Sequence, residues 1–398
     1  MKILMLVQSS VAGDSRVLRE ATALVEAGHD VSVIGRDVPD GFVPPACVSV
    51  LSVARSSGLG RGTVTSRGRP APGALRRVTG LARRGVRWAL LPEHRERVER
   101  GWCAEAREAA VRAGPFDAVH AHDFNTLALA AELAARWEVP YVYDSHEYWT
   151  GRPRVGRPTP WLDRRVRRAE RELGTDAAAV ITVGEGVARA LADIHGFSGV
   201  QVVRNTFPDP EGPLEPPSTP VGLVYAGRLA ADRELEVIAA ASREVDLPVT
   251  LIGPADPAWL DRFDAGHATI LPSGSLDDVD RLLAEAGIAL VTHSDRWPNH
   301  RLAMPNKLFH AVRAGVPVVA TDVGELAREV RAHGVGALYR PGDVAHMLDA
   351  IEDVRTDYQA YLKRVRAARE EMSWAVDARV LASVYAGLGT PGHPRDDR

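Results

Sequence analysis

Short apolar segments alternate with amphipathic segments along most of the chain. In the first half the apolar segments predict strands at Lys2–Val7, Val31–Ile34, Val48–Val53, Ala118–His120, Tyr141–Tyr143, Ala179–Thr182 and Val200–Val203. Stretches with helical periodicity, such as Ser15–Ala27, Leu127–Arg136 and Gly186–Ile194, predict helices between them. Short, continuously apolar strands separated by helices are typical of a parallel sheet that is covered on both faces.

The same alternation returns after a proline-rich segment. The residues FPDPEGPLEPPSTP, which start at Phe207, can neither continue a helix nor join a central strand, so they predict a linker between domains. Beyond it, strands are predicted at Gly222–Tyr225, Val249–Ile252, Ala268–Leu271, Ile288–Thr292, Val316–Ala320 and Ala337–Tyr339. We therefore expect two doubly wound α/β domains, whose strands point their carboxyl ends into a shared cleft.

The length of 398 residues also favours two domains over one hydrophobic core. We place the N-terminal domain at residues 1–207, the linker at 208–220 and the C-terminal domain at 221–375. A helix at 376–388 is expected to return to the N-terminal domain, and residues 389–398 are expected to form a tail.

One segment of the N-terminal half departs from this pattern. Residues 55–100 carry twelve arginines and no strand signal, and we interpret them as an insertion. Within it, Gly73–Leu91 places apolar residues at helical spacing with arginines on the other face. Such a helix can lie on an anionic membrane surface, or it can pack its apolar side on its own domain. The sequence leaves both interpretations open.

Composition narrows the class of protein. The net charge of −3 argues against a dedicated nucleic-acid binder, which would carry a basic domain. The two cysteines, Cys47 and Cys103, provide neither a disulfide framework nor a zinc site. The apolar N-terminus is too short for a signal peptide, and no apolar stretch is long enough to cross a bilayer. We expect a cytoplasmic enzyme, with a peripheral position on the cytoplasmic face of the membrane as the second possibility.

Chemistry is first indicated by the turn Pro305-Asn306-Lys307. It holds one of only three lysines in the chain and stands directly before an apolar-periodic helix. Free backbone N–H groups and the helix dipole favour negative charge at a helix N-terminus, and an adjacent ammonium adds to the effect. The turn therefore predicts an anion site, with an ordinary capped helix and an exposed lysine as the alternative.

Several motifs together resemble family 4 of the nucleotide-sugar-dependent glycosyltransferases, which have the GT-B fold. The motifs are KILMLVQSSVAGDSRVLREATALVEAGHDVSVIG, FDAVHAHDFNTLALAAELA, VPYVYDSHEYW, AAAVITVGEGVARAL, VVRNTFP, VYAGRLAADRELEVIAAA, VTLIGP, PNKLFHAVRAGVPVVATDVGE and VGALYRPGD. Their order covers nearly the whole chain. The resemblance implies transfer of a sugar from a nucleoside diphosphate to an acceptor hydroxyl, with retention and without a metal or cofactor. It also implies a role in cell-envelope polysaccharide, glycolipid or natural-product glycosylation.

The resemblance implies roles for residues of the C-terminal domain. Arg228, Arg233 and Lys307 match the positions that clamp the donor diphosphate. Gly227, Asn306 and Leu308 belong to the same donor motifs, and Glu325 matches a Gly-x-x-Glu turn that can bind the donor or cap the following helix. The family's Glu-x7-Glu motif is altered, with Leu302 at the first position, as in a subgroup with a Pro-x-Lys motif.

The second position of that motif is His310. A neutral imidazole has one donor and one acceptor, whereas a carboxylate can accept from both ribose hydroxyls. This difference favours a deoxyribonucleotide donor such as a thymidine diphosphate sugar, unless another group serves the 2′-hydroxyl.

The resemblance also implies roles for residues of the N-terminal domain. His146 matches the active-site histidine that contacts the transferred sugar. Gly13, in the loop after the first strand, would allow close backbone approach across the cleft or is a plain turn glycine. Asp14 and Arg16 stand where an acceptor could bind, although N-capping of a helix explains Asp14 equally well. We expect His120 and His122 to point to opposite faces of their strand and to be structural.

Two other functions fit the same fold. A nucleotide-sugar epimerase would alter the donor without any acceptor. A non-catalytic member would bind a nucleotide or a partner protein without turnover, and His310 in place of glutamate is the residue that suggests it.

Overall fold

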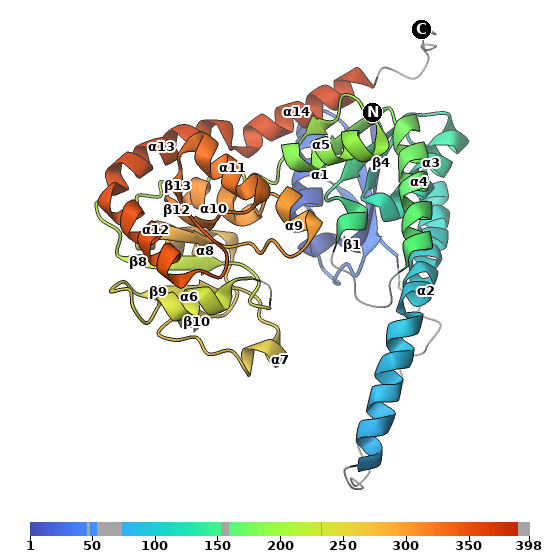
Figure 1. Ribbon diagram of the computed structural model, residues 1–398. Helices are drawn as coiled ribbons and strands as arrows, with labels where there is room; N and C mark the ends of the chain where they lie inside the picture. The colour runs from blue at the N-terminus through green and yellow to red at the C-terminus, as the bar shows by residue number, and fades with distance from the viewer. Residues whose placement is uncertain (46–47, 54–73, 153–158, 232, 389–398) are drawn as a thin grey trace. The chain divides into compact units, whose positions relative to one another are not determined.

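The computed structural model describes residues 1–398 except 46–47, 54–73, 153–158, 232 and 389–398 (Figure 1). The side chains of residues 74–90 and 95 are also outside the description. Much of the arginine-rich insertion and the whole predicted tail therefore lie outside the described residues. The chain divides into two compact units. Unit 1 comprises residues 1–181, 192–200 and 381–398, and unit 2 comprises 182–191 and 201–380.

The N-terminal half of the chain forms a seven-stranded sheet in the order β3-β2-β1-β4-β5-β6-β7. Its strands are β1 (Lys2–Ser10), β2 (Asp30–Arg36), β3 (Ser49–Ser52), β4 (Ala118–His122), β5 (Tyr141–Ser145), β6 (Ala179–Thr182) and β7 (Gln201–Val202). The helices along this part of the chain are α1 (Ser15–Glu26), α2 (Ala74–Ala113), α3 (Phe124–Trp137), α4 (Pro160–Asp176) and α5 (Glu185–His195). Strand β1 pairs in parallel with both β2 and β4.

Unit 2 contains a six-stranded parallel sheet in the order β10-β9-β8-β11-β12-β13. Its strands are β8 (Gly222–Ala226), β9 (Val249–Ile252), β10 (Thr269–Leu271), β11 (Gly287–Val291), β12 (Val318–Thr321) and β13 (Gly336–Tyr339). Its helices are α6 (Leu235–Ala241), α7 (Pro257–Leu260), α8 (Leu276–Ala286), α9 (Pro298–Leu302), α10 (Asn306–Ala314), α11 (Gly324–His333), α12 (Val344–Thr356) and α13 (Tyr358–Glu371). The last helix, α14 (Trp374–Gly387), begins in unit 2 and ends in unit 1.

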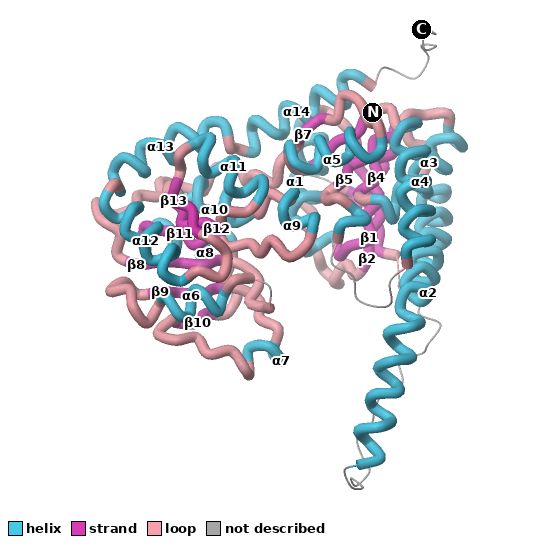
Figure 2. The backbone as a smooth tube through the Cα atoms, in the orientation of Figure 1, coloured by secondary structure: helices cyan, strands magenta, loops and turns pink. Residues whose placement is uncertain are grey.

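Both faces of the unit 2 sheet are buried by helices. Successive residues of a strand point to opposite faces, so each strand contributes side chains to two separate apolar cores. On one side, Val224 of β8 joins an apolar core with residues of α8, α10 and α13. On the other side, Leu223 and Tyr225 join a second core with residues of α6 and α12. Figure 2 shows the strands of each unit between layers of helices. The structure thus confirms the predicted fold class, and every predicted strand is present with ends shifted by a few residues.

From Ala74 onward, the helix predicted within Gly73–Leu91 is part of α2, a single helix that contains Pro92. A search of the described residues finds no helix that is both long and apolar enough to cross a membrane. Between β7 and β8 the chain forms no helix or strand, and the predicted linker lies there.

Candidate active site

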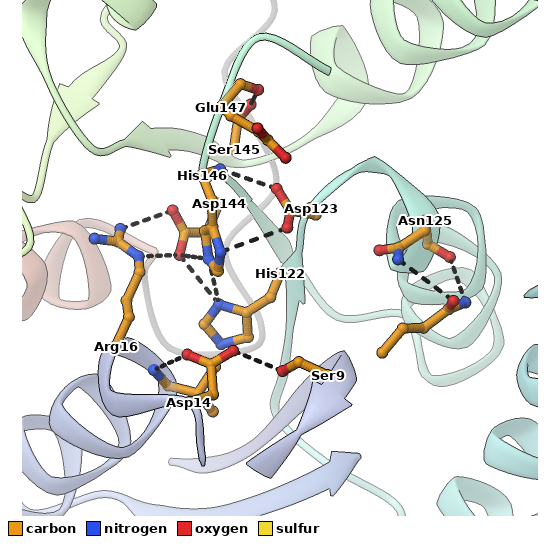
Figure 3. Close-up of polar contacts among 12 residues, drawn as sticks. Ser9, Asp14, Arg16, His122, Asp123, Asn125, Asp144, Ser145, His146 and Glu147 are labelled. Carbon is orange, nitrogen blue, oxygen red and sulfur yellow. Dashed lines mark hydrogen bonds and ion pairs between the residues drawn. The ribbon is translucent and has the colours of Figure 1, made fainter. Parts of the chain in front are cut away.

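Unit 1 gathers charged and imidazole side chains at the carboxyl ends of β4 and β5, where a parallel sheet places its ligands. Asp144 lies on β5, His146 directly follows that strand, and His122 ends β4 (Figure 3). The first turn of α1 adds Arg16, because β1 and β4 are neighbours in the sheet and α1 follows β1. Residues distant in sequence therefore meet at one edge of the sheet.

Asp144 is the centre of this cluster and is fully buried. Its carboxylate accepts from Arg16 Nε at 3.0 Å and from Arg16 Nη2 at 2.8 Å. The same carboxylate lies 3.1 Å from His122 Nδ1 and 2.9 Å from His146 Nε2. Burial alone would raise the pKa of Asp144, but the charges of Arg16 and His146 outweigh it and hold that pKa well below its ordinary range.

The two histidines on Asp144 carry different charges. Burial lowers the pKa of His122 to about 3, so this imidazole is neutral. Burial also acts to lower the pKa of His146, but the carboxylates of Asp123 and Asp144 outweigh it and raise that pKa to about 10. At neutral pH His146 is therefore an imidazolium, and its side chain is 19% exposed. It can donate hydrogen bonds but cannot accept a proton.

The expectation that His120 and His122 point to opposite faces is wrong. Residues two positions apart on a strand share a face. The two rings stack with centroids 4.3 Å apart, and both are buried. His120 is nevertheless held structurally, because its Nδ1 lies 2.7 Å from the hydroxyl of Tyr385 on α14.

The loop after β1 has mixed roles. Asp14 caps α1, accepting from the backbone N–H of Val17 at 3.3 Å, as the alternative interpretation predicted. Its pKa is lowered, since the charge of His146 and a hydrogen bond from Ser9 outweigh its burial. Gly13 is exposed, and a Cβ there would meet nothing within 4 Å. Arg16 is only 5% exposed and is bound to carboxylates, so its predicted contact with an acceptor stays a prediction.

Strained backbone marks the same edge of the sheet. Asp123, directly after β4, has a φ of 65°, which a non-glycine residue rarely adopts. Its carboxylate accepts from the backbone N–H of His146 at 3.1 Å and lies 3.5 Å from the ring Nδ1 of that residue. Strain of this kind persists where surrounding structure fixes it, often at functional sites. Here the strained residue holds the backbone of His146 through that hydrogen bond.

Four buried side chains around Asp144 have the residue types of a metal site. One ligand atom from each of Glu20, His120, His122 and Asp144 lies within 4.8 Å of all the others. The Nε of Arg16, however, is 2.9 Å from Glu20 and 3.0 Å from Asp144. A cation already lies between the two carboxylates, so we assign no metal to this cluster.

Unit 2 gathers cations at the carboxyl ends of β8 and β11. Lys307 opens α10 and packs against Gly227, where an added Cβ would come within 3.3 Å of the lysine Cδ. Its Nζ lies 5.2 Å from the centroid of the Tyr225 ring. Thr292 donates to the backbone carbonyl of Arg233 at 2.6 Å, which ties the loop after β11 to the loop before α6.

These cations have no counter-ion in the described part of the chain. Among the described residues, no carboxylate forms an ion pair with Arg228, Arg233 or Lys307. Burial and then the charge of Arg233 lower the pKa of Lys307 to about 7. Burial and a neighbouring guanidinium both disfavour the charged form of this half-buried lysine. A bound anion would favour that charged form, so the position is suited to an anionic ligand.

The other predicted donor residues are placed in several ways. Arg228 and Asn306 are exposed, and Leu308 is buried in the core. Glu325 lies in the first turn of α11 and pairs with Arg328 at 2.5 Å, while burial raises its pKa. His310 directs Nδ1 to the buried carboxylate of Asp280 at 3.4 Å, and its ring packs on Phe207 with centroids 4.1 Å apart.

Sequence reasoning missed three members of these sites. Asp144 and His122 were visible in the segments YDSH and HAHD, because polar residues that end apolar strands of a parallel sheet converge at one edge. His293 follows β11 in the segment THSD. It lies close enough to Lys307 for the charge of that lysine to lower its pKa. Nothing in its local sequence distinguished it.

Comparison with known proteins follows the same division. Residues 13–206 match the family model of a glycosyl transferase 4-like domain, and residues 220–357 match glycosyl transferases group 1. The fold is that of sucrose-phosphate synthase from Thermosynechococcus elongatus, with a TM-score of 0.71 over 98% of this chain and 99% of that one at 15% identity. The chain is a GT-B glycosyltransferase.

Other proteins resemble this glycosyltransferase in part or throughout. It is 28% identical to a glycogen synthase of Mycobacterium tuberculosis over 289 residues, which is 68% of each chain. It is 24% identical to a D-inositol 3-phosphate glycosyltransferase of Paenarthrobacter aurescens over 68% of this chain and 73% of that one. The structure of HepE from Anabaena in complex with UDP-glucose shares the fold with a TM-score of 0.67, at 16% identity over 97% and 99% of the two chains.

Proposed function

We propose that this glycosyltransferase takes its sugar from a nucleoside diphosphate and transfers it to an acceptor hydroxyl. The observation that carries the proposal is the cation cluster of unit 2, where Lys307 and Arg233 lack a carboxylate partner among the described residues. The N-terminus of α10 adds its free N–H groups beside Lys307. The HepE structures, whose ligands are UDP and UDP-glucose, support a diphosphate ligand for this kind of fold.

The chemistry that we propose is transfer with retention. The bond between the anomeric carbon and the phosphate oxygen breaks, and the acceptor oxygen attacks from the same face. The acceptor proton passes to an oxygen of the departing diphosphate, so no protein base is required. Lys307, Arg228 and Arg233 stabilise the negative charge that develops on the leaving group.

His146 is assigned a contact with the transferred sugar. Because its pKa is about 10, it stays protonated at neutral pH. Its ring nitrogens face Asp144 and Asp123, so its contribution is a positive charge that attracts electron-rich oxygens of the sugar or the diphosphate. A protonated histidine cannot remove the acceptor proton, which agrees with a leaving group that acts as the base. Asp14 and Arg16 are proposed to lie on the acceptor side, with Gly13 beside the donor.

The experiment that tests the function is turnover of a panel of nucleotide sugars by the purified protein. Release of free sugar, or transfer when acceptors are added, supports a transferase. An altered nucleotide sugar without acceptor would instead show an epimerase, and binding without turnover would show a non-catalytic member. A thermal-shift panel of nucleoside diphosphates chooses the donor first, because ligands that bind only the native state raise its stability.

Tighter binding of dTDP than of UDP or GDP is expected from His310.

Binding of a diphosphate should add a proton to the protein near pH 8. Lys307, with a pKa of about 7, is then mostly neutral, and a bound anion favours its charged form. The ligand is fully ionised at that pH, since its second phosphate pKa is roughly 6. Affinity is therefore highest between about pH 6 and 7 and falls at higher pH, by up to about tenfold per unit. The proton uptake is measured by calorimetry, from the difference in the apparent enthalpy of UDP binding between HEPES and Tris buffers. Lys307→Met should abolish this proton uptake. Equal apparent enthalpies in both buffers would contradict the assignment.

We also propose that the helix at Gly73–Leu91 attaches the enzyme to an anionic membrane, which would favour a lipid-linked acceptor. Co-sedimentation with vesicles of phosphatidylglycerol is expected at low salt and should be lost as salt rises, because charges are screened within about 8 Å at physiological ionic strength. Glutamine at Arg76, Arg77, Arg83 and Arg84 should abolish it. The matched control carries glutamine at four exposed arginines of unit 2, namely Arg262, Arg281, Arg340 and Arg366. Failure to sediment at low salt would favour a packed helix and a soluble acceptor.

A further inference from the structure

His293 directly follows β11 and is nearly enclosed, with only 6% of its surface exposed. Its backbone N–H donates to Thr321 Oγ1 at 2.8 Å, which fixes the residue at the strand end. Neither ring nitrogen has a hydrogen-bond partner within the described protein. Buried polar atoms in native proteins are nearly always paired, so an imidazole with two unpaired nitrogens needs an explanation.

The surroundings of this ring are cationic. After burial, the charges of Lys307, His300 and Arg233 lower the pKa of His293 to about 3. The His300 ring lies 4.7 Å away and is itself occupied, since its Nδ1 lies 2.9 Å from Ser294 Oγ. His293 is thus a neutral imidazole near Lys307 and Arg233, which have no carboxylate partner among the described residues.

One kind of ligand can accept hydrogen bonds from His293, Lys307 and Arg233 together. A neutral imidazole offers one N–H donor, and Lys307 and Arg233 offer only donors. An anion with several acceptor oxygens can accept from each of them, whereas a neutral hydroxyl would leave the two charges without a counter-ion. A diphosphate has this character.

We infer that His293 is a further donor-site residue, whose ring N–H donates to a phosphate oxygen of the nucleoside diphosphate. The inference rests on the proposed function, because it assigns one more contact to the same site. In this role His293 contacts the phosphates of the leaving group. It recognises the ligand by its phosphates, and it contacts neither the base nor the sugar.

The test is calorimetric binding of inorganic pyrophosphate, a probe without base or sugar. His293→Leu should weaken binding about tenfold, the loss expected for one hydrogen bond to a charged group. His293→Asn and His293→Gln each restore an N–H at the position of one ring nitrogen, and one of them should retain most of the affinity. The melting temperature of free His293→Leu should equal or exceed that of the wild type, because leucine removes an unpaired buried polar group.

Lys307→Ala separates failure of this inference from failure of the proposed function. If the wild type binds neither pyrophosphate nor UDP, the proposed function itself fails. If Lys307→Ala loses affinity while His293→Leu retains it, only the role of His293 is overturned. A lowered melting temperature in His293→Leu, without rescue by either amide variant, would show that the histidine supports the fold and does not contact the ligand.

Discussion

Alanine at Lys307 should lower the rate of sugar transfer about 100-fold or more, because it removes a preorganised charge from the leaving diphosphate. The aliphatic part of the lysine side chain lies near the start of α10 against Gly227, which limits its positions. The fold should remain intact, since no described carboxylate depends on this lysine as an ion-pair partner. The measurement is kcat and kcat/KM with the donor that the panel identifies.

The control for that experiment is Lys363→Ala, which changes an exposed lysine of α13. It should retain the wild-type rate. Arg228→Ala tests the second predicted clamp residue and, because Arg228 is exposed, should abolish transfer without loss of stability. Wild-type rates in both Lys307→Ala and Arg228→Ala would show that the phosphates bind elsewhere.

Asparagine at Asp144 should lower the free energy of unfolding by about 3–5 kcal/mol, the usual cost of leaving a buried charge without its partner. Asparagine preserves the shape but not the charge that Arg16 and His146 require. The pKa of His146 should fall toward its ordinary value of 6.5, because one of the two carboxylates that raise it is lost. Urea denaturation measures the first effect, and NMR titration of the imidazole measures the second.

The sign of the accompanying pH dependence follows from the raised pKa of His146. In the wild type this group contributes stability that is full below pH 6.5 and is lost as pH rises toward 10. Asp144→Asn should reduce that dependence. The control is Arg107→Ala, which breaks an exposed pair with Glu132 and should cost less than about 1 kcal/mol. Similar losses in the two variants would contradict the central role of Asp144.

The order of strands and helices could be predicted because it depends on short-range patterns. A short, mostly apolar run such as Val249–Ile252 favours a strand that is buried in a parallel sheet, and the structure has it with the same ends. The position of Lys307 at a helix start followed in the same way from the residues around it. Motif resemblance then indicated His146, whose environment the sequence did not reveal.

The sequence by itself determined the two α/β halves, because periodicity and turn chemistry act over a few residues. The resemblance of its motifs to a known family then indicated the class of enzyme. Only the tertiary structure decided how these residues work. Asp144 meets Arg16 across 128 residues of chain, and this contact sets the charge of the neighbouring His146. His293 acquires its cationic surroundings from Lys307 and Arg233, which belong to other segments. Charge states and unpaired groups arise from burial and from neighbours distant in sequence, and no local pattern encodes either.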